Sequence, residues 1–147
     1  MKNLVAALAG VLALGVAAHG ASAAEHVINM LNKGADGKVM VFEPDFVRAA
    51  VGDTIKLVPV DKGHFAVSLN KVWPADVPKI KSKLNTELIF TVEKEGIYGL
   101  NCTPHYAMGM VAMVQVGTAV PDDVKALKFP GEVGKRFTAQ LEKAAAP

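Results

Sequence analysis

One short stretch of the chain carries three side chains that bind soft metals. Cys102 is the only cysteine, His105 follows it by three residues and Met110 follows it by eight. A thiolate, an imidazole and a thioether are three of the four ligands of a type 1 copper site, and His64 is the leading candidate for the second imidazole. This ligand set suits both Cu(I) and Cu(II), so little geometry has to change when an electron arrives or leaves. The four residues predict one copper ion used for electron transfer.

The residues between these ligands suit a tight metal-binding loop. Pro104 stiffens the link between Cys102 and His105, because its ring fixes one backbone angle. Gly109 allows the backbone to turn so that Met110 approaches the metal from the axial side. Each residue taken alone has a plainer interpretation, such as a buried thiol, a core methionine or a turn. The combination is what favours copper.

Two other chemistries use the same residues. Zinc accepts Cys and His, but a thioether binds it poorly, and structural zinc sites use more Cys or His ligands than this loop offers. A Cys102 nucleophile activated by His105 would need a third residue to orient the histidine, and none is suggested nearby. Copper storage or delivery is the alternative within copper biology. An enzyme is disfavoured, because four protein ligands leave no open position for a substrate.

Short segments with strand patterning surround the loop and must position it. They are separated by turns such as Gly34–Gly37 and Gly52–Asp53. Strands of this length and spacing predict an all-β fold, a two-sheet Greek-key sandwich with the ligand loop at one end. The expected strands are Val27–Leu31, Lys38–Glu43, Phe46–Ala49, Thr54–Val60, Phe65–Leu69, Glu87–Val92, Ile97–Asn101 and Val111–Val116. Ile55 and Leu57 are expected to face the core. The sequence leaves open whether Trp73 covers the core or lies on the surface.

The C-terminal extension, residues 121–147, changes from strand to helix patterning. Pro121 and the two acids after it open a short helix to about Leu127. Glu132–Ala145 reads as a second helix whose apolar face carries Val133, Phe137 and Leu141. We expect both helices to pack on the sandwich.

The N-terminus reads as an export signal. A positive start at Lys2, an apolar run from Leu4 to Ala18 and the cleavage pattern Ala21–Ala23 predict a signal peptide over residues 1–23. Residues 24–147 would then form one periplasmic domain without a membrane segment. Cleavage of the signal peptide removes Lys2 and leaves 15 basic and 14 acidic residues. The resulting net charge of +1 does not favour nucleic-acid binding. His26 lies near the new N-terminus and is given no role.

The chain resembles the cupredoxin family and, within it, the pseudoazurins. The resemblance rests on stretches that run through nearly the whole mature chain, above all Asp61–His64 and Cys102–Met110, with Met30–Gly34, Met40–Pro44, Val51–Thr54, Lys81–Lys83 and Gly96–Gly99. It implies that His64, Cys102, His105 and Met110 bind the copper ion. The helical C-terminal extension favours the pseudoazurins over plastocyanin-like proteins. The resemblance also implies a periplasmic, monomeric electron carrier that donates to a nitrite reductase or a cytochrome.

The resemblance further implies a docking surface around His105. Met40, Pro59, Pro104 and Met108 match the apolar positions, and Lys33, Lys62 and Lys81 match the surrounding basic ring. Lys71 and Lys83 are interpreted as ordinary surface charges. Lysines placed in this way would steer an acidic partner toward the site.

Three positions depart from the family pattern. Phe65 stands where an asparagine usually follows the first ligand histidine and ties the two ligand loops together, so its side-chain bonds are lost. We expect the backbone N–H of Phe65 to remain close to the thiolate. Asn101 replaces a lysine before the ligand cysteine, and Ala107 replaces a glycine after the loop tyrosine. None of the three changes removes a metal ligand.

Overall fold

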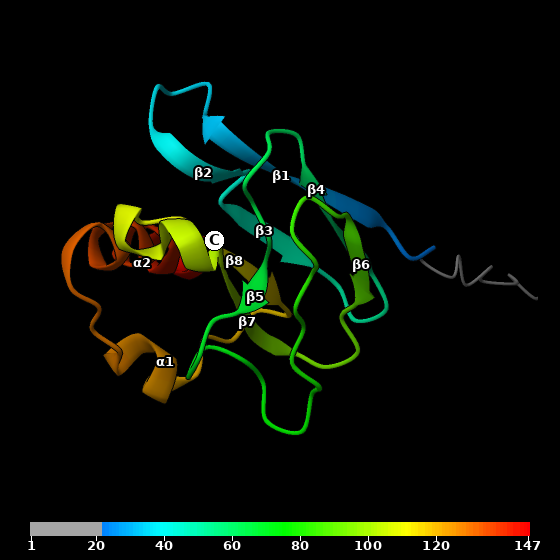
Figure 1. Cartoon of the computed structure of the whole chain (residues 1–147). Helices are drawn as coiled ribbons and strands as arrows, with labels where there is room; N and C mark the ends of the chain where they lie inside the picture. The colour runs from blue at the N-terminus through cyan, green and yellow to red at the C-terminus, as the bar shows by residue number, and fades with distance from the viewer. Residues whose placement is uncertain (1–21) are drawn as a thin grey trace, which may run out of the picture.

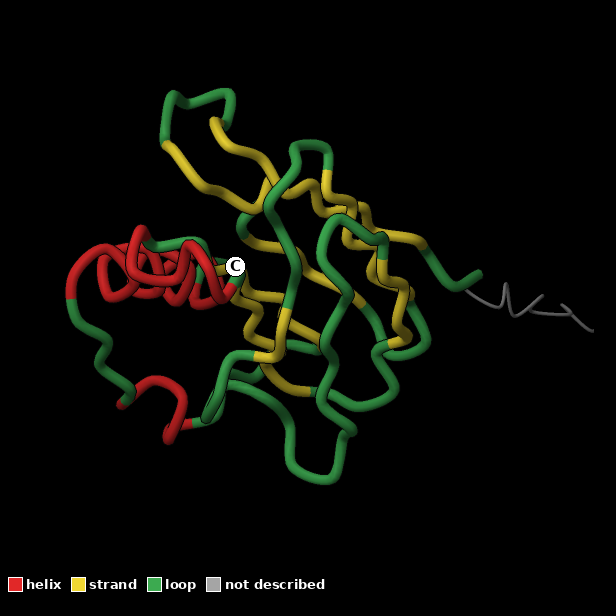
Figure 2. Tube along the Cα trace, viewed as in Figure 1, coloured by secondary structure: helices red, strands yellow, loops and turns green. Residues whose placement is uncertain are grey.

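Two four-stranded sheets packed face to face make up the body of the protein. The structure, a computed structural model, describes residues 22–147 (Figures 1 and 2). In this part of the chain one sheet has the strand order β2-β1-β4-β6, with β1 Glu25–Lys33, β2 Val39–Glu43, β4 Thr54–Pro59 and β6 Leu88–Thr91. The other has the order β3-β8-β7-β5, with β3 Phe46–Ala49, β5 Val67–Ser68, β7 Gly96–Asn101 and β8 Val111–Val116. The predicted all-β sandwich is confirmed.

The chain passes repeatedly between the two sheets. As a result β1 pairs with β4, and β3 with β8, as parallel neighbours, while the other pairs are antiparallel. Parallel partners cannot be joined by a tight hairpin, so each parallel pair requires a crossover through the opposite sheet. This arrangement brings the β4–β5 and β7–β8 connections to the same end of the sandwich.

Alternating apolar residues fill the space between the sheets. Ile28 and Met30 of β1 and Ile55 and Leu57 of β4 are fully buried, as the period of two predicts. All six residues of β8 are buried instead of every second one. The reason is that both faces of this strand are covered, one by the opposite sheet and one by the C-terminal helices.

Both C-terminal helices lie on the outer face of the β3-β8-β7-β5 sheet. Helix α1 spans Asp122–Ala126 and α2 spans Gly131–Ala145, next to β8 and on the opposite side of the molecule from β6 (Figure 1). Val133, Phe137 and Ala144 of α2 are buried, and Phe137 and Ala144 belong to the same apolar cluster as Met113 of β8. The predicted packing of the helices on the sandwich is confirmed.

The predicted strand Phe65–Leu69 is shorter in the structure, where only Val67–Ser68 forms β5. The backbone of this segment bonds elsewhere: Ser68 N donates to Ile80 O at 3.0 Å and Ser82 N donates to Ala66 O at 2.8 Å. These bonds join the segment to the long β5–β6 connection. The other predicted strands match the observed ones to within two residues.

Trp73 contributes to the core and is not a free surface residue. Its ring lies 4.9 Å from that of Tyr98 and 5.9 Å from that of Phe90, and its Nε1–H donates to Val77 O at 3.2 Å. The tryptophan therefore closes one end of the apolar core.

The predicted signal peptide falls mostly on residues that the structure does not describe. Of the predicted signal peptide, residues 1–21 lie outside the described residues. Within residues 22–147, no helix has both the length and the apolar character needed to cross a membrane.

Candidate metal centre

The β7–β8 connection is a short, internally bonded loop. Strand β7 ends at Asn101, and a 3-10 helix over Thr103–Met108 follows Cys102. Within the loop, His105 N donates to Cys102 O at 3.0 Å, and Cys102 N donates to Met110 O at 3.0 Å. Gly109 has a φ of 85°, a conformation that glycine adopts without strain, and it turns the chain into β8. The loop therefore holds the cysteine, histidine and methionine close together.

His64 reaches this loop from the β4–β5 connection. The backbone there is fixed by Asn85, whose Oδ1 accepts from Gly63 N at 2.6 Å and whose N–H donates to His64 O at 2.9 Å. The imidazole points inward and is fully buried. Two connections that are far apart in sequence thus deliver side chains to one point.

Three metal-binding atoms converge at that point. Cys102 Sγ lies 3.7 Å from His64 Nδ1 and 3.5 Å from His105 Nδ1. The sulfur and one nitrogen of each ring all lie within 4.8 Å of one another. Cys102 and His64 are fully buried, whereas His105 is half-buried. One thiolate and two imidazole nitrogens around a common centre fit a copper ion.

Met110 lies at the base of the same loop. It is fully buried and belongs to the same core cluster as Cys102. Its N–H donates to His105 O at 3.3 Å, so its backbone is bonded to both loop ligands. The four predicted metal-site residues are therefore brought together, and they form the pattern of a type 1 copper site.

Asn32 fixes the orientation and tautomer of His64. Its Oδ1 lies 3.0 Å from His64 Nε2, and because Oδ1 only accepts, Nε2 must carry the hydrogen. The neutral ring then presents a lone pair on Nδ1 toward Cys102. Asn32 belongs to the stretch Met30–Gly34 that supported the resemblance, but nothing in its type or spacing marked it as a partner of His64.

The burial of the site controls its protonation. Desolvation lowers the pKa of His64, and the nearby His105 lowers it further, so this imidazole stays neutral. Burial raises the pKa of the Cys102 thiol, while backbone N–H groups of Phe65 and His105 act in the opposite direction. A bound cation would displace the thiol proton, which couples metal binding to proton release. The influence of the Phe65 backbone N–H on this pKa agrees with the expectation that it remains near the sulfur.

The Phe65 ring lies beside Lys81 of the β5–β6 connection. The Lys81 ammonium lies 5.8 Å from the centre of its ring, a cation–π contact. Asn85 does not link the two ligand loops: through Gly63 N and His64 O it ties the connection that carries His64 to the β5–β6 connection.

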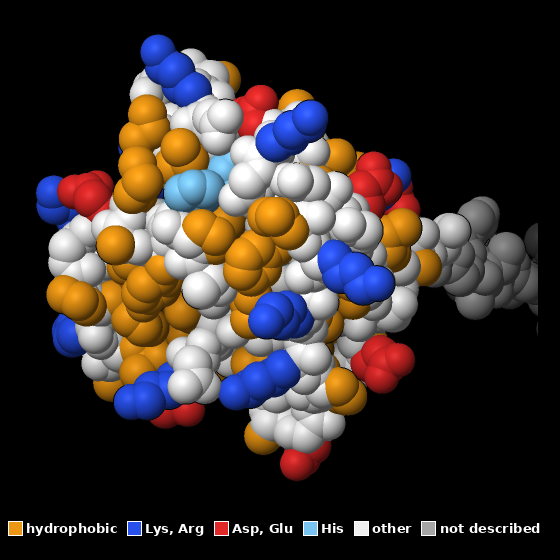
Figure 3. Space-filling model, in the orientation of Figure 1, with side chains coloured by type: hydrophobic (Ala, Val, Ile, Leu, Met, Phe, Trp, Pro, Cys, Tyr) orange, Lys and Arg blue, Asp and Glu red, His pale blue; other side chains and the backbone are white. Residues whose placement is uncertain are grey.

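The face that carries the metal centre has mixed apolar and basic character. Figure 3 shows histidine atoms at the surface among hydrophobic groups, with Lys and Arg side chains on the same face. Met108 is 42% exposed, although it is hydrophobic. Of the other expected docking residues, Pro104, Lys33, Lys62 and Lys81 are exposed, and Met40 and Pro59 are partly buried. Lys71 and Lys83 are also exposed.

His26 has a structural partner away from the metal centre. Its Nε2 lies 2.9 Å from Asp53 Oδ2, and Ala24 N and Ala50 N donate to the same carboxylate at 2.8 and 2.9 Å. The sequence offered no signal for this cluster, because it depends on the parallel pairing of β1 with β4.

Comparisons with known proteins agree with this geometry. Residues 28–117 match the family model of copper binding proteins, plastocyanin/azurin family. A pseudoazurin of Paracoccus pantotrophus is 48% identical over 141 residues, which cover 95% of this chain and 94% of the relative.

Solved structures give the same result. The crystal structure of native pseudoazurin from Hyphomicrobium denitrificans has a TM-score of 0.76 at 46% identity, covering 81% of this chain and 97% of that one. The pseudoazurin of Methylobacterium extorquens AM1 has a TM-score of 0.75 at 36% identity, covering 81% of this chain and 98% of that one. Sequence, fold and metal centre agree, and the chain belongs to the plastocyanin/azurin family of copper-binding electron-transfer proteins and, within it, to the pseudoazurins.

Proposed function

We propose that His64, Cys102, His105 and Met110 bind one copper ion and that the protein carries single electrons between redox partners in the periplasm. The observation that carries the proposal is the convergence of Cys102 Sγ with the Nδ1 atoms of His64 and His105. The copper ion, when bound, supplies one-electron chemistry between Cu(I) and Cu(II). The residues of the chain would hold the ion, enclose the site and provide the surface on which a partner docks.

The surrounding structure supports a carrier over a storage protein. Both ligand loops are fixed by backbone hydrogen bonds, and three of the four ligand residues are fully buried. A rigid, enclosed site limits the rearrangement that accompanies electron transfer, and it slows the exchange of metal that a delivery protein requires.

The exposed edge of the site supports electron exit through His105. This residue alone among the four ligands is only half-buried, and exposed Pro104 and Met108 lie in the same 3-10 helix. An apolar contact of this kind suits brief docking, since electron-transfer complexes have small interfaces. Lys33, Lys62 and Lys81 would steer an acidic partner, such as a nitrite reductase or a cytochrome.

The periplasmic location rests on the N-terminal sequence. The apolar run and the Ala21–Ala23 pattern support cleavage before Ala24. A chain with a single cysteine cannot form an internal disulfide, and a metal site gives that thiol a use in an oxidising compartment.

Redox cycling in the presence of a chelator separates the two candidate functions. The mature protein, loaded with copper, is reduced and reoxidised repeatedly while a Cu(I) chelator competes for the metal. A carrier retains its copper in both states and shows a reversible potential. Rapid loss of Cu(I) to the chelator would instead favour storage or delivery.

The docking surface is tested by charge removal at matched positions. The double variant Lys62→Gln/Lys81→Gln is compared with the double variant Lys94→Gln/Lys125→Gln. The second pair removes the same number of positive charges from segments that follow β6 and β8, at the end of the sandwich opposite to the metal centre. Oxidation by the anion hexacyanoferrate(III) should slow by about 3- to 10-fold in the first pair only, and the difference should vanish at high salt. Equal rates for the two pairs would contradict the docking assignment.

A further inference from the structure

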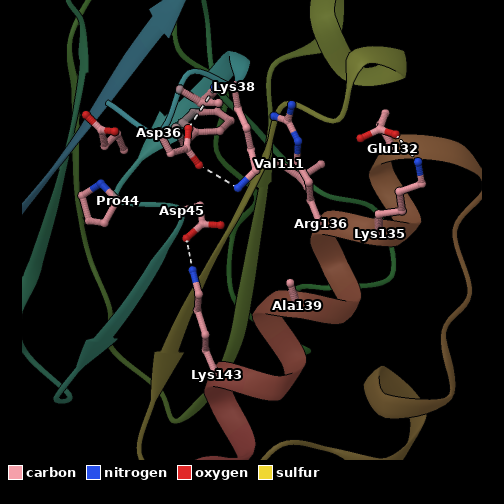
Figure 4. A pocket seen from close by; sticks show the side chains of 13 residues that line it. Asp36, Lys38, Pro44, Asp45, Val111, Glu132, Lys135, Arg136, Ala139 and Lys143 are labelled. Carbon is pink, nitrogen blue, oxygen red and sulfur yellow. Dashed lines mark hydrogen bonds and ion pairs between the residues drawn. The ribbon is translucent and has the colours of Figure 1, made fainter. Parts of the chain in front are cut away.

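Two polar side chains of α2 reach across to the backbone on either side of Met110. Arg136 Nη1 donates to Gly109 O at 3.1 Å, and Gln140 Nε2 donates to Val111 O at 3.0 Å. Figure 4 shows Arg136 extending from α2 toward the start of β8, next to Val111. The carbonyls that flank the proposed axial ligand are thus both held by one helix.

Arg136 also connects this segment to β2. Its Nη1 donates to Met40 O at 2.8 Å and its Nη2 donates to Val39 O at 3.0 Å. A Cβ added to Gly109 would lie 2.9 Å from Arg136 Nε, so the guanidinium packs directly on the turn before Met110. One side chain therefore fixes Gly109 relative to a second strand.

The helix has an apolar anchor on the sheet besides these polar contacts. Its apolar residues Val133, Phe137 and Ala144 are buried, and they supply the ordinary hydrophobic anchor. Gln140 is fully buried as well, and its Oε1 has no hydrogen-bond partner. A buried, half-satisfied amide is costly compared with an apolar side chain of similar size. Its Nε2–H satisfies the buried carbonyl of Val111, so the amide ties this point of the helix to the start of β8.

We propose that Arg136 and Gln140 are positioning residues for Met110, which they act on by holding the carbonyls of Gly109 and Val111. This inference rests on the proposed function, in which the Met110 thioether is the axial copper ligand. A thioether binds copper weakly, so the protein backbone sets how closely it approaches the metal. Groups beyond the direct ligands tune metal sites in this way. The C-terminal helix is then part of the metal centre and not only a cover for the sheet.

The test uses variants that keep the helix in place. Gln140→Leu replaces the amide with an apolar group of similar size, and Arg136→Gln removes the guanidinium. Lys135→Gln is the matched surface control, because Lys135 bonds only to Glu132 one turn away on α2. Phe137→Leu is the packing control, since it loosens the apolar anchor but leaves both polar contacts.

Two readouts report on the metal site and on the loop separately. In the copper-loaded protein, the reduction potential and the relative intensity of the two visible thiolate-to-copper bands should shift in Gln140→Leu and Arg136→Gln, and most in the double variant. In the metal-free protein, exchange of the Cys102 amide hydrogen, which bonds to Met110 O, should become about fivefold faster for each lost contact. Lys135→Gln should change neither readout.

The outcomes distinguish this inference from the proposed function. Absence of thiolate-to-copper bands in the parent protein would overturn the proposed function, while the exchange measurement would still decide whether the helix holds the loop. Bands and exchange rates that are unchanged in the double variant would overturn the positioning role. It would also be overturned if Phe137→Leu shifted the potential as much as the double variant, because loose packing alone would then explain the effect.

Discussion

Replacing Asn32 by leucine tests whether a single hydrogen bond orients the first ligand histidine. His64 Nε2 donates to Asn32 Oδ1 at 3.0 Å, and the ring is fully buried. Leucine removes the acceptor and leaves the N–H without this partner, so the ring loses the contact that selects its tautomer. Loss of such a partner weakens metal binding by about 10- to 100-fold, or about 1.4 to 2.8 kcal/mol.

Competition with a Cu(II) chelator at fixed pH measures this change. Asn32→Asp retains an acceptor oxygen at the same position and should bind copper nearly as tightly as the parent protein. Lys33→Gln alters the neighbouring exposed residue and serves as the surface control. If Asn32→Leu bound copper with the parent affinity, the role assigned to the Asn32 contact would be refuted.

Two further predictions concern stability. Asp53 accepts hydrogen bonds from the backbone nitrogens of Ala50 and Ala24 and from His26, and together they lower its pKa to about 2. Because the unfolded carboxyl has a pKa of 3.8, the stabilisation is complete above about pH 5 and is lost as the pH falls toward 2. The melting temperature of Asp53→Asn should therefore lie below the parent value at pH 6 and approach it near pH 2; a constant gap would contradict the assignment. Gly99→Ala should cost about 1 to 3 kcal/mol in urea unfolding, since its Cβ would lie 2.8 Å from the side chain of Val72. Val72→Gly, which removes both Val72 carbons that lie at 2.8 Å, should partly rescue Gly99→Ala, whereas simple addition of the two losses would show that this clash is not the cause.

The parts of the fold that follow from local patterning were predictable. The alternation that buries Ile55 and Leu57 was visible in the sequence, and so were the turns that separate the strands. The metal centre was predictable for a different reason. Three ligand types lie within nine residues, from Cys102 to Met110, and few other chemistries use that combination.

Contacts between distant segments were not predictable. The bonds that shorten β5 come from Ile80 and Ser82, residues in a connection whose path no local pattern describes. The pairing of His26 with Asp53 exists only because β1 and β4 are parallel neighbours. One sequence, read by periodicity, contains no information on which strands become neighbours.

The polar contacts of α2 illustrate the same limit. The helical period places Gln140, seven residues after Val133, on the buried face, but its polar side chain gave no reason to expect burial. Whether Arg136 and Gln140 face the β7–β8 connection depends on where the helix lies along β8. That position is set by tertiary packing of Phe137 and its neighbours, not by helix propensity.

The visible and EPR spectra of the mature protein with one equivalent of Cu(II) test the central claim most directly. The parent protein should show an intense thiolate-to-copper absorption and the narrow copper hyperfine splitting of a type 1 site, and both should disappear in Cys102→Ser. A protein that stays colourless with Cu(II) while binding Zn(II) at the same residues would contradict the account, since the convergent thiolate and imidazoles would then serve a structural metal.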